Sequence, residues 1–342
     1  MKQITKICAE TCAEFISVYF LSVLCTMLFI LFFYIKSYSQ YDSYSQFYNS
    51  ELTLNPALTG MIPATWQVKD IYQYQTNNNN PGINTNSLFA EYKIPLFKIH
   101  KKDYGLNIKE SSNSTLGIGI LDQRSISNKK INFRSNYLSI ALNTKMLSDL
   151  YFSFGIQPGI IELKDKDIYD MNFGFLFGYK EMWCQKQDQI FKFQIGASIY
   201  HISQSYHSNE DSVFTPSRKI QAHTSALTDI SKKIGLVTNV HYVFKKDNYF
   251  NLGTTMLIKS HHTNYDRIRF GIHYKTTNHL VLSAGIRTFG NQINTHLFDI
   301  CISYDMMICA KSDYKEAIEI SILFSPLKKC WEINRCGNKL EN

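Results

Sequence analysis

The feature that most constrains this chain is a series of short segments, from Leu116 to the C-terminus, in which apolar and polar side chains alternate. Successive side chains of an extended strand point to opposite faces, so each such segment has one apolar face and one polar face. In residues 191–199 the apolar face carries Phe191, Phe193, Ile195, Ala197 and Ile199. The same alternation recurs in residues 268–275, 298–305 and 318–324.

The length of these segments indicates where the apolar face lies. Strands of water-soluble proteins are usually about 5–6 residues long, whereas several of these segments approach about ten residues, the length that crosses a bilayer at a tilt. The chain contains 22 Tyr and 23 Phe but only 3 Trp, and abundant aromatic residues suit the girdles of a membrane barrel. Its mean hydropathy of −0.20 excludes a bundle of membrane helices. We therefore predict an all-β fold, a transmembrane antiparallel β-barrel.

The alternation and the turn-forming residues between segments predict about fourteen strands, and bacterial single-chain barrels have even numbers. The predicted strands are residues 65–75, 86–95, 116–125, 132–144, 150–159, 170–180, 191–202, 220–229, 234–244, 249–259, 266–275, 279–289, 296–306 and 315–324. The barrel would span residues 65–325. The longer connections, such as 99–114 and 201–217, would lie at the barrel ends. Glycines within strand patterns, such as Gly117, Gly155 and Gly196, would permit bends or close packing inside the barrel.

The N-terminus indicates export. An apolar run over residues 15–35 follows Lys2 and Lys6 and precedes small residues at Ser37 and Ser39. This pattern predicts a signal peptide over 1–39 that is cleaved before Gln40. The apolar run is longer than the usual length of about 7–15 residues, so an uncleaved inner-membrane anchor is the alternative. A periplasmic lead-in over 40–64 and a C-terminal tail over 326–342 would flank the barrel.

Charge, cysteines and motifs exclude several classes of function. The net charge of +8 is spread along the chain without a basic face beside exposed aromatics, so we expect no binding of nucleic acid. Removal of residues 1–39 leaves five cysteines without a CxxC pair, of which Cys330 and Cys336 form a disulfide or stay as free thiols. No catalytic or phosphate-binding motif occurs in a supporting context. We predict no enzyme, no catalytic residue, no cofactor and no metal site.

A resemblance to a known family adds a function. Residues 45–49 (Ser-Gln-Phe-Tyr-Asn), followed by 54–60 (Leu-Asn-Pro-Ala-Leu-Thr-Gly), resemble the N-terminal signature of the PorP/SprF family of the type IX secretion system. Four later segments resemble further parts of that family in the same order: residues 195–204, 216–223, 300–305 and 317–322.

The resemblance implies an outer-membrane component of the type IX secretion system that supports secretion or surface anchoring of clients such as adhesins. Its partners would be periplasmic ring or translocon proteins, a secreted client and outer-membrane lipid. A porin or small-solute channel with an Arg- and Lys-lined lumen is one alternative. A soluble all-β binding module held by an uncleaved N-terminal helix is the other.

Two sets of residues are candidates for the functional site. The signature residues would form a structured plug or a periplasmic contact, or simply the turn that leads into the first strand: Gln46, Phe47, Asn55, Pro56 and Gly60. Four polar residues would face the lumen or the barrel rim: Arg218, His223, Arg269 and Arg287.

The barrel assignment also predicts how the two faces tolerate charge. An arginine at Ile195 or Ile302, on the lipid face, should cost about 2–4 kcal/mol at mid-bilayer. An arginine at Ser198 or Ser303 should be tolerated better, because these positions would face a watery lumen.

Overall fold

The computed structural model describes residues 44–62, 64–77, 82–96, 98–101, 109–112, 114–127, 130–146, 150–163, 166–179, 191–203, 218–231, 233–244, 248–259, 267–289, 296–308 and 314–326. The chain divides into two compact units, Met1–Ser37 and Tyr38–Asn342, and all described residues belong to the second. The predicted signal peptide, Cys330 and Cys336 lie outside the described residues.

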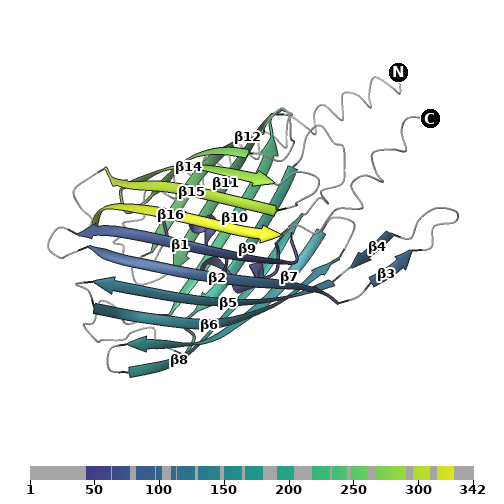
Figure 1. Ribbon diagram of the computed structural model, residues 1–342, viewed down its shortest axis with the longest axis horizontal. Coiled ribbons are helices and arrows are strands. Elements are labelled where there is room, and N and C mark those ends of the chain that lie inside the picture. Colours follow the sequence, from purple (N-terminus) through teal and green to yellow (C-terminus); the bar gives the residue numbers. More distant parts are fainter. Residues whose placement is uncertain are drawn as a thin grey trace, which may run out of the picture. The chain divides into compact units, whose positions relative to one another are not determined.

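Fourteen strands close into one antiparallel barrel (Figure 1), in which each strand pairs with its neighbours in the sequence and the first pairs with the last. The strands are β1 (Trp66–Asn77), β2 (Ile83–Pro95), β5 (Ser114–Ser127), β6 (Lys130–Lys145), β7 (Leu150–Leu163), β8 (Lys166–Tyr179), β9 (Phe191–Tyr200), β10 (Lys219–Asp229), β11 (Ile234–Phe244), β12 (Tyr249–Lys259), β13 (Arg267–Lys275), β14 (His279–Phe289), β15 (His296–Met307) and β16 (Tyr314–Pro326). The predicted fold class and strand number are confirmed.

The connection between β2 and β5, expected as a loop, contains a separate hairpin of β3 (Lys98–Lys101) and β4 (Lys109–Ser112). Because the strand number is even, the start of β1 and the finish of β16 lie at the same end of the barrel, which we call the terminal end. Among the described residues, no helix has the length and apolarity needed to cross a membrane.

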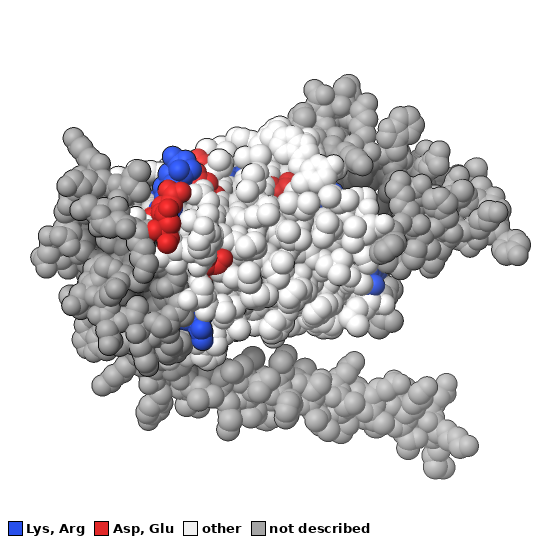
Figure 2. All heavy atoms as spheres, turned by 90° about the horizontal axis from the view of Figure 1, so that it is seen from below, with Lys and Arg blue, Asp and Glu red and all other residues white. Residues whose placement is uncertain are grey.

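The alternation of side chains divides the wall into two faces, as predicted. In β13, Ile268, Phe270 and Ile272 are exposed on the outside, whereas Arg269 and His273 are buried inside. Figure 2 shows one side of the barrel, where uncharged residues cover most of the described surface and charged residues gather in a few places. An apolar outer surface is what contact with lipid requires.

The strands differ in length around the barrel. The strands β5–β8 have 14 to 16 residues, whereas β9–β11 have 10 or 11. At the barrel end opposite the terminal end, the outer face of β5 and β6 carries an ion-pair network. In it, Asp122 bonds Arg124 at 2.7 Å and Arg134 at 3.0 Å. Charges facing hydrocarbon are costly, so this part of the wall extends beyond the hydrocarbon layer.

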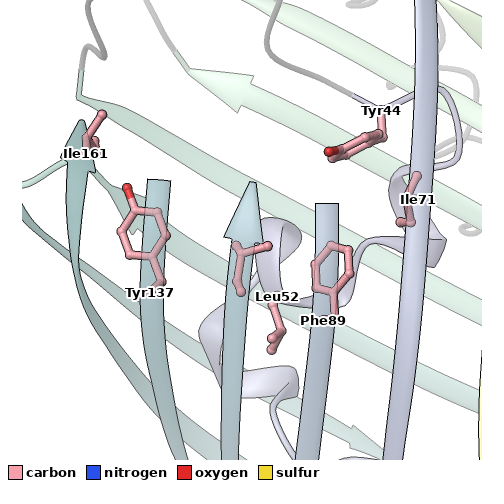
Figure 3. Close-up of a cluster of buried hydrophobic side chains, with 7 residues drawn as sticks. Tyr44, Leu52, Ile71, Phe89, Tyr137 and Ile161 are labelled. Carbon is pink, nitrogen blue, oxygen red and sulfur yellow. The ribbon is translucent and has the colours of Figure 1, made fainter. Parts of the chain in front are cut away.

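The hydrophobic core lies inside the barrel, between the wall and residues 44–62, which we call the plug. The plug contains three short helices: η1 (Phe47–Asn49), α2 (Glu51–Leu54) and η2 (Pro56–Leu58). Figure 3 shows one buried cluster, which joins Tyr44 and Leu52 of the plug to wall residues Ile71, Phe89, Leu121, Tyr137 and Ile161. A second cluster joins plug residues Phe47, Leu54, Ala57 and Leu58 to Tyr151 and Leu176.

Candidate functional site

The turn-forming residues of the signature shape the C-terminal half of the plug. Asn55 is extended (φ −162°, ψ 120°), and its Oδ1 accepts a hydrogen bond from the Ala57 amide at 2.9 Å. Pro56 begins η2, a position that suits its fixed φ. Gly60 has φ +71°, a left-handed conformation that glycine adopts without steric cost. These residues therefore fold the segment into two compact turns.

Asn55 also binds the plug to the wall. Its Nδ2 donates to the backbone oxygens of Phe175 in β8, at 3.0 Å, and of Ala197 in β9, at 3.3 Å. The side chain is fully buried, so its oxygen organises the turn while its nitrogen fixes the turn to two adjacent strands. A buried amide with both ends bonded stabilises one arrangement over others.

Glycines let the plug backbone approach the wall directly. A Cβ atom added at Gly117, Gly155 or Gly174 would overlap atoms of Thr59, Pro56 or Asn55, respectively. Close packing inside the barrel, one of the two roles that the sequence suggested for Gly117 and Gly155, is thus observed at both positions.

The N-terminal half of the plug is held by carboxylates of β15 and β16. Glu319 accepts hydrogen bonds from the amides of Ser45 at 2.6 Å and Gln46 at 3.1 Å. Asp305 accepts from the Ser45 hydroxyl at 3.0 Å, and Gln46 Nε2 donates to the Ser303 hydroxyl at 3.1 Å. The three wall residues lie in the segments 300–305 and 317–322, so the C-terminal signature segments contact the N-terminal one.

The wall also satisfies carbonyl groups that the short helices of the plug leave unpaired. Ser198 donates to the Leu54 oxygen at 2.9 Å, Tyr200 to the Leu52 oxygen at 3.0 Å, and Ser153 to the Ala57 oxygen at 2.6 Å. Two of these donors, Ser198 and Tyr200, belong to the signature segment 195–204.

These contacts correct one sequence-based expectation. Arginine was expected to be tolerated at Ser198 and Ser303 because both would face water, but each is only 1% exposed and bonded to the plug. An arginine at either position would have to displace the plug.

An aromatic pair of the plug stacks on histidines of the wall. Phe47 lies 5.0 Å from His241 with ring planes at 25°, and Tyr48 lies 4.9 Å from His273 at 17°. The Tyr48 hydroxyl donates to Ser283 at 3.2 Å. Burial raises the pKa of Tyr48, so this hydroxyl stays protonated and keeps its role as a donor.

Sequence reasoning also missed charged residues of the site, among them one each on β1 and β2. Glu91 in β2 accepts a hydrogen bond from the Gly60 amide at 2.8 Å. Lys69 in β1 donates to the Asn49 oxygen at 2.7 Å and bonds the carboxylate of Glu51 in the plug. The sequence does contain a signal for Glu91 and Lys69, because both lie on the inner side of an alternating strand, where a buried charge needs a partner.

The four polar candidates lie at different places. Arg269 and Arg287 both bond Asp299 inside the barrel, the latter at 2.6 Å from its Nε. His223 is buried on the inner side of β10. Arg218, just before β10 at the end opposite the terminal end, donates to the Ile202 oxygen at 2.8 Å. The structure therefore brings Arg269 and Arg287 together but places Arg218 at the rim.

Within the described part of the chain, no group of three or more His, Cys, Asp or Glu residues could hold a metal ion. Cys301 is a buried free thiol.

The fold and this internal site define a class of protein: a closed β-barrel of the outer-membrane type whose lumen is occupied by its own N-terminal segment. The chain belongs to the family of the type IX secretion system membrane protein PorP/SprF, whose family model matches residues 36–324. The resemblance drawn from the motifs is thereby confirmed, and the chain is an outer-membrane protein of that secretion system.

A comparison with solved structures finds similarity to other proteins at low identity. A Pseudomonas aeruginosa FadL homologue is 8% identical with a TM-score of 0.47, and the match covers 79% of this chain and 91% of that one. The Pseudomonas putida toluene transporter TodX is 8% identical with a TM-score of 0.45, covering 84% and 94%. The Acinetobacter baumannii outer membrane protein Omp33 is 11% identical with a TM-score of 0.40, covering 77% and 98%. A comparison with curated protein sequences gives no match.

Proposed function

We propose that this protein is a plugged, non-conducting barrel of the type IX secretion system that supports the secretion or surface anchoring of a client protein. In this role the client does not pass through the lumen. The observation that carries the proposal is the fixed plug, whose signature residues bond strands on opposite sides of the barrel.

The charges of the lumen support this proposal over the porin alternative. A pore for anions would use cationic side chains that are free to meet the solute. In the described lumen, Arg269 and Arg287 share Asp299, and Lys275 bonds Asp305 at 2.6 Å. The two arginines are therefore engaged within the wall, and Lys275 bonds the carboxylate that also holds Ser45 of the plug.

Because the plug blocks passage through the lumen, the barrel ends and the outer wall are the main surfaces for partners. We infer that other proteins of the secretion system and the client dock there. Family membership supports partners within that system, and an adhesin is the client class that the sequence resemblance suggested.

A locked plug tests the proposal. The Thr59 and Ser139 hydroxyl oxygens lie 2.6 Å apart, so cysteines at both positions are placed to form a disulfide, which needs about 2.05 Å between sulfurs. We expect Thr59→Cys/Ser139→Cys to restore client secretion to a deletion strain as well as the single variant Thr59→Cys does. Loss of secretion in the double variant alone, reversed by a reductant, would show that the plug must move and would refute the proposal.

Affinity purification provides the second test. A C-terminally tagged barrel recovered from the outer membrane should bring type IX components or one secreted client with it. Recovery without either, together with steady conductance in planar bilayers, would favour a porin.

A further inference from the structure

A cavity of about 390 Å³ lies between the plug and the wall. Its wall residues include Tyr151, Tyr179 and Leu227, which lie close to the ends of β7, β8 and β10 at the terminal end of the barrel. The volume lies within the range of about 300–1,000 Å³ that is typical of small-molecule sites.

The lining of this cavity is suited to an aromatic group. Three aromatic side chains that lie inside the barrel contribute to it: Phe47 and Tyr48 of the plug and Tyr151 of the wall. Aromatic rings pack favourably against one another in offset or edge-to-face arrangements. A flat ring could therefore contact several of these side chains at once.

One polar residue of the lining has no partner. His223 is 3% exposed, and neither of its ring nitrogens has a hydrogen-bond partner among the described residues. Buried polar groups are paired in the great majority of cases. The wall makes room for this ring, because a Cβ at Gly196 would lie 2.6 Å from His223 Cε1.

The acidic residues of the lining are already engaged. Both oxygens of Glu91 accept hydrogen bonds, from Gly60 and from Gln67, each at 2.8 Å, and Glu51 bonds Lys69. A ligand therefore needs no positive charge to enter. It needs one group that can bond an imidazole, and a hydroxyl can donate to the unprotonated ring nitrogen.

We propose that this cavity binds a phenol-type group, an uncharged aromatic ring that carries a hydroxyl, with the hydroxyl bonded to His223. Such a group is available as a tyrosine side chain of a partner polypeptide or as a free small phenol. The inference goes beyond the proposed secretion function and does not depend on it.

The test uses the full barrel in lipid nanodiscs and follows 4-methylphenol, the tyrosine side chain, by saturation-transfer difference NMR, with empty nanodiscs as the blank. We expect saturable binding above the blank and at least tenfold weaker binding of 4-methylanisole, whose oxygen cannot donate. The proposal is overturned by binding no greater than the blank, or by equal binding of the two compounds.

Two matched variants on β10 test whether 4-methylphenol binds in this cavity. Leu227→Trp fills the cavity from the wall and should weaken 4-methylphenol binding at least tenfold, whereas Thr228→Trp, on the exposed outer face, should leave it unchanged. His223→Phe should remove the preference for 4-methylphenol over 4-methylanisole. Equal titrations for the Leu227 and Thr228 variants would contradict the assignment, even if the histidine variant fails to fold.

Binding of N-acetyl-tyrosine amide distinguishes a tyrosine of a partner polypeptide from a free small phenol. If it binds and Leu227→Trp abolishes its binding, the site accepts a tyrosine within a polypeptide. If only 4-methylphenol binds, the site takes a free phenol. Both readings are made on purified barrel, so a failure here is separate from a failure of the secretion test with the locked plug.

Discussion

Replacement of Gly155 by alanine should loosen the plug without touching the lipid face. An added Cβ at Gly155 would overlap the Pro56 carbonyl group and lie 2.5 Å from the Ala57 amide nitrogen. These are backbone atoms, so no side chain can rotate away. Because carbon atoms pack best at about 3.5–4.0 Å, η2 must move by roughly 1 Å.

The size of the effect follows from two contributions. Overpacking in a filled interior costs about 1–3 kcal/mol. The movement of η2 also breaks the hydrogen bond from Ser153 to the Ala57 oxygen, which is 2.6 Å long and contributes roughly 1 kcal/mol. The free energy of unfolding should therefore fall by about 2–4 kcal/mol.

Urea unfolding of the refolded barrel in lipid vesicles, followed by tryptophan fluorescence, measures this change. Gly235→Ala is the matched control, since a Cβ there would meet the Asp229 carboxylate end at 2.8 Å, outside the plug. Planar-bilayer recordings should also show intermittent conductance for Gly155→Ala only. Equal stability and conductance of the two variants would mean that the plug is not packed against β7 as described.

Three further outcomes follow from the same contacts. Arginine at Ile302, which is 51% exposed on the outer face, should reduce stability by about 2–4 kcal/mol at mid-bilayer, and arginine at Ser303 should now reduce it at least as much; heat-modifiable migration on gels compares their folded fractions. Asn55→Ala should destabilise the barrel by about 1–3 kcal/mol, because it leaves buried backbone groups unpaired, and Asn84→Ala, on the outer face, should change urea unfolding little. Glu319→Gln retains one acceptor oxygen in place of two, so hydrogen exchange should speed up at the N-terminal half of the plug and remain unchanged in β10–β12.

The sequence alone determined the wall of the barrel. The predicted strands over residues 234–244, 249–259 and 279–289 agree with β11, β12 and β14 at both ends. Strand identity depends on a local period of two and on turn residues between the strands, and both are visible within about ten residues. The outward position of Ile195 and Ile302 was predictable for the same reason.

Only the tertiary structure decided what fills the lumen. Polar residues on the inner face of a strand, such as Ser303 and Glu319, are equally compatible with water and with a protein segment. Their partners, Gln46 and Ser45, lie more than 250 residues away in the chain, and no local pattern records a contact over that separation. The turn residues of the signature likewise predicted compact turns around Asn55, but only closure of the barrel surrounds those turns with donors and acceptors that hold them inside.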